Sequence, residues 1–169
     1  MLEAERGDGA RHGLAIQYSP EREALETAGG IANALPILGP EPFLVINADI
    51  YCDYDFAALG ALSLGERLAH LVLVDNPAQH SRGDFALEAG QVAESGAAKL
   101  TYSGIGVYAP RLFGGIPAGA KAPLAPLLRK AMGAGRVSGE HYRGRWHDIG
   151  TAERLQALDA ALRGSPAHT

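Results

Sequence analysis

Short apolar runs of strand length alternate along this chain with segments in which apolar residues recur at helical spacing. Phe43–Ile46 and His70–Val74 each contain four consecutive apolar residues, which predicts strands buried on both faces. Leu100–Tyr108 predicts a further strand, and its internal glycines are typical of a bulge or of a ligand close to the backbone. Strands that alternate with helices indicate an α/β protein with a mostly parallel sheet.

Weaker patterns predict several smaller elements. The polar N-terminal stretch has the character of a helix tail that ends near residues 7–9, where glycines stand. The alternation of apolar and polar residues over Leu14–Tyr18 predicts a strand. Ile31–Leu35 is a short apolar segment that Pro36 is expected to stop. The segment 84–92 predicts a small hairpin.

Apolar residues at helical spacing predict three helices, over 56–62, 124–132 and 155–162. Asp55 precedes the first helix and Thr151 the last, and both residue types are good N-caps. We expect each helix to bury one apolar face, with three leucines on that face in the last one.

Composition narrows the class of protein. At 169 residues with 47% hydrophobic residues, the chain predicts one globular domain over 1–169, without repeats or linkers. The net charge of −4 argues against a general nucleic-acid binder, and no apolar run reaches the length of about 18 residues that a membrane span needs. The single cysteine, Cys52, excludes an internal disulfide and fits a reducing cytoplasm.

Two aspartates are candidates for a cation site. Asp49 follows the most apolar strand candidate, and open α/β sheets bind ligands at the carboxyl ends of their strands. Asp148 stands just before the last predicted helix. One or two carboxylates with substrate phosphates are the usual ligands of Mg²⁺. Asp49 can equally be a turn residue, and Asp148 can simply favour the positive end of a helix, so both interpretations stay open.

Two further motifs are less specific. Gly29-Gly30 opens a predicted helix, where exposed backbone N–H groups could approach a base or a phosphate, but an ordinary helix-entry turn explains it as well. Asp53-Tyr54-Asp55 has the Asp-x-Asp form found in metal-dependent glycosyltransferases, although Asp55 is also a plausible N-cap. The histidines show no zinc-ligand spacing, and the chain contains neither a nucleophile elbow nor a Walker A loop.

Six segments, in this order, resemble the sugar-1-phosphate nucleotidyltransferases, and they extend over nearly the whole chain. They are Tyr18–Glu21, Glu26–Ile31, Phe43–Ile50, Gly83–Phe85, Thr101–Tyr108 and Trp146–Thr151. Within that family the sequence looks most like the N-acetylmuramate-1-phosphate uridylyltransferases of peptidoglycan recycling. Many similar sequences carry the label mannose-1-phosphate guanylyltransferase.

The resemblance implies a Rossmann-like fold and a cytoplasmic transferase of nucleotide-sugar biosynthesis with small-molecule substrates. It would transfer a uridylyl group from UTP to N-acetylmuramate 1-phosphate, which gives a nucleotide sugar and releases pyrophosphate. The alternatives are a mannose-1-phosphate guanylyltransferase-type activity, or a non-catalytic remnant that binds a nucleotide sugar weakly. By the same resemblance, Asp49 and Asp148 are the catalytic carboxylates that hold Mg²⁺. The residues matching the nucleobase loop are Glu26, Thr27, Gly29 and Gly30. Those matching the sugar-phosphate side are Asn47, Gly83, Ser103 and Gly104.

The sequence also departs from the family pattern. Relatives begin with a strand, a Gly-x-Gly-x-Arg loop that wraps the triphosphate, and a Pro-Lys-Pro segment. This sequence has no such strand before Gly7–Arg11, which only superficially matches the loop. We therefore expect an N-terminally truncated domain, with weak or no turnover by these 169 residues alone.

Overall fold

The computed structural model describes residues 2–164, which fold into two compact units. The first unit comprises residues up to Glu41 together with Pro110–Leu127, and the second comprises Pro42–Ala109 together with the chain from Leu128 onward. The predicted mixture of helices and strands is confirmed. Helix α4 (Leu124–Gly133), at a position close to the predicted one, passes from the first unit into the second.

The first unit is helical. It contains α1 (Leu2–Arg6), η1 (Ala10–His12), α2 (Glu26–Leu38) and η3 (Pro110–Leu112). Helix α1 ends just before Gly7, as predicted. Pro36 does not stop α2, which continues to Leu38, because a proline in the last turn removes only one of the final hydrogen bonds.

The prediction of a strand over Leu14–Tyr18 is wrong. A strand needs a neighbouring strand to accept and donate its backbone hydrogen bonds, and no described strand pairs with this segment. The alternating pattern alone is therefore not enough to form a strand here. The segment instead folds back on the end of α1: the Ile16 N–H donates to the Asp8 carbonyl at 2.8 Å, and the Tyr18 hydroxyl donates to the Gly7 carbonyl at 2.7 Å.

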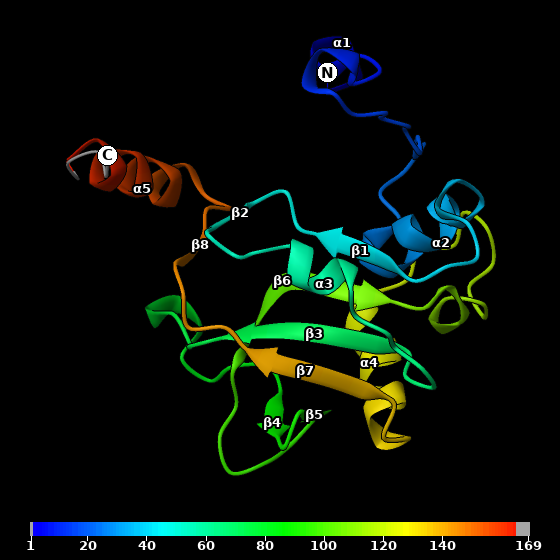
Figure 1. Cartoon of the computed structure of the whole chain (residues 1–169), viewed down its shortest axis with the longest axis vertical. Coiled ribbons are helices and arrows are strands. Elements are labelled where there is room, and N and C mark those ends of the chain that lie inside the picture. Colours follow the sequence, from blue (N-terminus) through cyan, green and yellow to red (C-terminus); the bar gives the residue numbers. More distant parts are fainter. Residues whose placement is uncertain (1, 165–169) are drawn as a thin grey trace. The chain divides into compact units, whose positions relative to one another are not determined.

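The second unit is built on a mixed sheet. Among the described residues its strand order is β1-β6-β3-β7-β5-β4 (Figure 1). The strands are β1 (Phe43–Ile46), β3 (Ala69–Val74), β4 (Ala86–Glu88), β5 (Gln91–Ala93), β6 (Thr101–Tyr108) and β7 (Val137–His141). Within residues 2–164 only β3 and β7 pair in parallel, so the sheet contains fewer parallel pairs than we predicted. The predicted hairpin is β4–β5.

Burial differs between the two apolar runs. Strand β3 lies inside the sheet and is buried along its whole length, as predicted. Strand β1 lies at the edge of the described sheet, and its Leu44 and Ile46 are 38% and 44% exposed, so the prediction of burial on both faces is wrong for β1. Strand β6 contains the predicted irregularity, because its register with β3 shifts between Val72 and Leu73.

A separate two-stranded ladder, the helices α3 (Ala57–Gly60) and α5 (Ala152–Gly164) and the short η2 (Ala78–His80) also belong to this unit. Strand β2 (Ile50–Cys52) pairs with β8 (Trp146–Asp148). Helix α3 is one turn long and packs with β2 on the apolar core formed by β3 and β6. Helix α5 begins after Thr151, but only Leu158 of its predicted apolar face is buried. Within residues 2–164 no helix has the length and apolar character to cross a bilayer.

Candidate functional site

The β2–β8 ladder brings Asp49 and Asp148 together. Its register pairs Ile50 with Asp148, which places Asp49 beside the end of β8. The Ile149 N–H donates to the Asp49 carbonyl at 2.8 Å and fixes the two segments to each other. Residues 99 positions apart therefore meet at one point of the second unit.

Gly150 shows how closely the two carboxylates approach. A Cβ atom at this position would lie 3.0 Å from Asp49 Oδ2 and 3.2 Å from Asp148 Oδ1. One oxygen of each carboxylate is thus within contact distance of the same small volume. Gly150 leaves that volume open because it has no side chain, a role that the sequence analysis did not assign to it.

The oxygens of Asp148 are oriented by neighbouring donors. Oδ1 accepts the Gly150 N–H at 2.9 Å, and Oδ2 accepts Nη1 of Arg154 at 2.6 Å. Among the described residues no group of three or more His, Cys, Asp or Glu side chains could hold a metal ion. Two carboxylates directed at one volume nevertheless fit Mg²⁺, which completes its shell with substrate phosphate and water.

A pocket of about 210 Å³ opens beside the two aspartates. Its lining includes the predicted residues Asn47, Asp49, Ser103, Gly104 and Asp148, and adds Ile50, Pro77, His80, Thr101, Tyr102 and Trp146. Trp146 is fixed in this wall because its indole N–H donates to the Ser103 carbonyl at 2.9 Å. The structure therefore brings together both predicted carboxylates and three of the four residues predicted for the sugar-phosphate side.

The backbone of β6 adapts to this pocket. Gly104 has φ +83°, and a Cβ there would lie 2.8 Å from the Asn47 amide, so only glycine lets Asn47 pack against the strand. The Ser103 hydroxyl donates to the Val72 carbonyl at 2.7 Å and accepts the Ile105 N–H at 3.1 Å. Because these bonds use its single proton inside the sheet, we do not expect the Ser103 hydroxyl to donate to a ligand.

Gly83 does not line the pocket. A Cβ there would lie 2.7 Å from Asn76 Oδ1 and 2.9 Å from the Lys99 carbonyl oxygen, which explains the glycine structurally. The loop that contains it does supply His80, a pocket residue that the sequence analysis missed. Asp84 orients His80 at 3.0 Å and is itself anchored by the Tyr102 N–H at 2.8 Å.

The four residues predicted for the nucleobase lie at the start of α2, in the first unit. The Ala28 and Gly29 N–H groups both donate to the Ala122 carbonyl at 3.0 Å, so the expectation of a free N–H is wrong at Gly29. A Cβ at Gly29 would lie 2.4 Å from the Ala120 carbonyl oxygen, which explains this glycine by close packing. Glu26 has a left-handed backbone, with φ 59°, and its carboxylate lies 3.7 Å from Lys121 Nζ.

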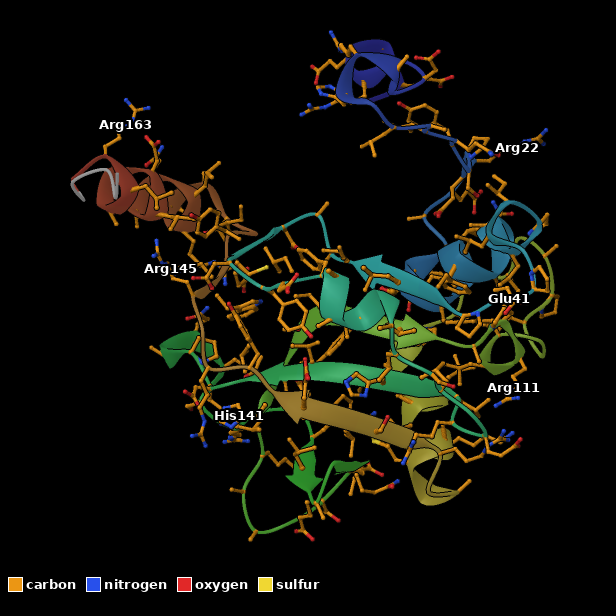
Figure 2. The ribbon with its side chains drawn as sticks, in the orientation of Figure 1. Arg22, Glu41, Arg111, His141, Arg145 and Arg163 are labelled. Carbon is orange, nitrogen blue, oxygen red and sulfur yellow. The ribbon has the colours of Figure 1, made fainter. Side chains whose placement is uncertain are left out.

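The Asp-x-Asp motif is occupied by structural contacts. Asp53 Oδ1 accepts the Arg145 N–H at 2.8 Å and the Tyr142 hydroxyl, and this hydroxyl is the main cause that lowers the pKa of the Asp53 carboxyl. The Arg145 side chain, seen beside the chain that leads into β8 in Figure 2, lies 3.7 Å from Asp53 Oδ2. Asp55 Oδ1 accepts the Ala57 N–H at 3.0 Å, as an N-terminal cap does. Neither aspartate lines the pocket described above.

Comparisons with known proteins identify relatives of this chain. The chain matches no family model. It is 48% identical to an N-acetylmuramate alpha-1-phosphate uridylyltransferase of Neisseria meningitidis serogroup B over 167 residues, which are 95% of this chain and 72% of that protein. It is 33% identical to a Caulobacter vibrioides protein of the same name over 160 residues, which are 87% of this chain and 66% of that protein.

The fold is also similar to a solved structure. A Bacillus anthracis protein, assigned as a glucose-1-phosphate thymidylyltransferase and crystallised with sucrose, matches with a TM-score of 0.80. The match covers 99% of this chain and 73% of that chain at 16% identity, a level that speaks for the fold alone. The predicted Rossmann-like α/β fold is thereby confirmed.

Proposed function

Since the chain belongs to the sugar-1-phosphate nucleotidyltransferases, we propose that it transfers a uridylyl group from UTP to N-acetylmuramate 1-phosphate. The products are UDP-N-acetylmuramate and pyrophosphate. The 48% identity to a uridylyltransferase with this acceptor supports the choice of base and sugar. We assign the reaction to cytoplasmic peptidoglycan recycling, as the resemblance of the sequence implies.

The observation that carries the proposal is the convergence of Asp49 and Asp148 at Gly150, beside a pocket at the ends of β1 and β3. A nucleotidyl transfer brings two anions together, because an oxygen of the sugar phosphate attacks the α-phosphorus of the nucleotide. The acceptor phosphate is itself the nucleophile, so the protein needs no serine, cysteine or histidine nucleophile. Catalysis then depends on positioning and on charge compensation.

The chain contributes the positions of its polar groups. Asp49 and Asp148 are the residues that would hold Mg²⁺, which when bound supplies positive charge to the reacting phosphates. Asn47, which directly follows β1, and the backbone of β6 at Gly104 would face the acceptor, and Trp146 forms a fixed wall. In the first unit, Glu26, Thr27, Gly29 and Gly30 are assigned to the nucleobase on the resemblance alone.

Two measurements on the full chain test this function. Pyrophosphate release from UTP and N-acetylmuramate 1-phosphate with Mg²⁺ tests the reaction, and mannose 1-phosphate with GTP is the competing pair. Calorimetry with UDP-N-acetylmuramate tests the site without requiring turnover by residues 1–169. We expect binding that depends on Mg²⁺ and a preference for the uridine and muramate pair. The proposal would be contradicted if the chain bound neither the nucleotide sugar nor the substrates.

A further inference from the structure

We propose that Arg154 recognises the carboxylate of the acceptor sugar and so sets the specificity of this site for acidic sugar 1-phosphates. The inference rests on the proposed function. N-acetylmuramate 1-phosphate carries a lactyl ether with a carboxylate, which N-acetylglucosamine 1-phosphate lacks. A site that selects the first compound over the second therefore requires a group that prefers an anion.

The guanidinium of Arg154 has unused hydrogen-bonding capacity. It lies in the first turn of α5, and the only side chain among residues 2–164 with which it forms a hydrogen bond is Asp148, which accepts Nη1. Its Nε–H is buried and has no acceptor in the described part of the chain. A buried donor without a partner is costly, and a guanidinium offers five N–H donors that suit a bidentate carboxylate. Part of this group is thus left for a second anion.

Arg154 lines a second pocket, of about 290 Å³, that lies next to the first one. The two pockets share Pro77, Trp146 and Asp148. The other lining residues of the second pocket are Gln79, His147, Ala157, Leu158 and Ala161. A ligand with its phosphate beside Asp148 can therefore extend past Trp146 into this space. Apolar walls with one cationic group suit a lactyl side chain, which has a methyl group and a carboxylate.

Charge singles out Arg154 among the pocket residues. It is the only arginine or lysine that lines either pocket in the described part of the chain. The histidine of the first pocket, His80, is held by Asp84. Asp148 compensates the charge of Arg154 at 2.6 Å. A sugar carboxylate would give the guanidinium a second anion and leave Asp148 more available to a cation.

The experiment compares two acceptors that differ only in the lactyl ether. Calorimetry measures the binding of N-acetylmuramate 1-phosphate and of N-acetylglucosamine 1-phosphate to the full chain with Mg²⁺. We expect Arg154→Gln to weaken binding of the first compound about 10- to 100-fold more than binding of the second, because the bond to the lactyl carboxylate is lost only with the first compound, whereas the bond to Asp148 is lost with both. Arg154→Lys keeps the charge and should retain part of the preference.

Arg163→Gln is the matched control, because Arg163 pairs with Asp159 near the far end of the same helix (Figure 2). It should change neither affinity, and melting curves of each variant establish that it is folded. An equal loss for both acceptors with Arg154→Gln would show that Arg154 only positions Asp148, and would overturn the inference. If the wild-type chain transfers uridylyl groups but binds both acceptors equally well, the inference about Arg154 is overturned and the proposed function is not. A wild-type chain that binds neither acceptor and transfers nothing would overturn both.

Discussion

Two pairs of aspartates lie near β2, and they differ in what surrounds their oxygens. Asp53 and Asp55 are neighbours in the sequence and form a recognisable motif, yet backbone N–H groups and a tyrosine hydroxyl occupy them. Asp49 and Asp148 are far apart in the sequence and form no motif. The oxygens of Asp148 also accept hydrogen bonds, from the Gly150 N–H and from Arg154, yet one oxygen of each aspartate borders the open volume at Gly150, beside the pocket. The comparison teaches that a shared open volume beside a pocket decides which carboxylates are available to a ligand, and spacing along the chain does not.

The largest expected effect comes from neutralising Asp49 or Asp148, and Asp53 of the other pair serves as the comparison. We expect Asp49→Asn and Asp148→Asn each to weaken Mg²⁺-dependent binding of UDP-N-acetylmuramate, and any uridylyl transfer, by about 100-fold or more, since each removes a charge directed at the reacting phosphates. Asp53→Asn should leave binding within about threefold and lower the melting temperature, because it weakens the contacts with Tyr142 and Arg145. Calorimetry and melting curves measure both. A loss of binding in Asp53→Asn alone would favour the glycosyltransferase alternative.

A smaller effect is expected from closing the space between Asp49 and Asp148. Gly150→Ala places a methyl group 3.0 Å and 3.2 Å from their oxygens. We expect about 10-fold weaker binding of UDP-N-acetylmuramate, because the carboxylates must move apart. The free energy of unfolding should change by less than about 1 kcal/mol, since Gly150 is exposed.

The single tryptophan provides a readout for this variant. Trp146 lines the pocket, so its fluorescence should respond to ligand in the wild type and should need about 10-fold more ligand in Gly150→Ala. Gly133→Ala, at a glycine with no atom near its missing Cβ, is the matched control. Unchanged affinity in Gly150→Ala would mean that the ligand does not use the volume between Asp49 and Asp148.

The smallest expected effect is on the pH dependence of stability. It arises from a histidine inside the sheet and not from the candidate site. Burial lowers the pKa of His70, whose Nδ1 lies 3.0 Å from Ser138 Oγ and whose Nε2 has no hydrogen-bond partner among the described residues. Below the ordinary value of 6.5 the unfolded chain binds a proton that the folded chain resists. The contribution of neutral His70 to the free energy of unfolding is therefore fully present above pH 6.5. It is lost as the pH falls from 6.5 toward the lower pKa of the folded state.

Denaturant unfolding at several pH values checks this expectation. His70→Gln should flatten the fall in stability below pH 6.5, whereas His12→Gln, at an exposed position, should leave the slope as it is in the wild type. If both variants keep the wild-type slope, His70 is not its source, and acid effects on binding would then have to arise nearer to the site.

The sequence predicted the elements whose patterns are strong and missed those that depend on neighbours. Strand β3 and the β4–β5 hairpin follow from apolar runs and turns. Strand β7 was not predicted, because Val137–His141 has little apolar pattern and is held in the sheet by β3 and β5 on either side. Leu14–Tyr18 has the alternating pattern of a strand but forms none, because no described strand lies beside it.

The site was predictable in part. Asp49 and Asp148 were named from their places after a strand and before a helix, and from a family resemblance. Their approach depends on the register of two three-residue strands, β2 and β8, which have no pattern that a sequence reading could use. Arg154 and Gly150 carry no signal of their own, because their importance lies in what they touch.

Anomalous diffraction from crystals grown with Mn²⁺ and UDP-N-acetylmuramate locates the cation directly. We predict one Mn²⁺ peak bonded to an oxygen of Asp49 and an oxygen of Asp148, in the open volume beside Gly150. A peak on Asp53 and Asp55, or a bound nucleotide sugar whose cation touches neither Asp49 nor Asp148, would contradict the assignment of these two carboxylates.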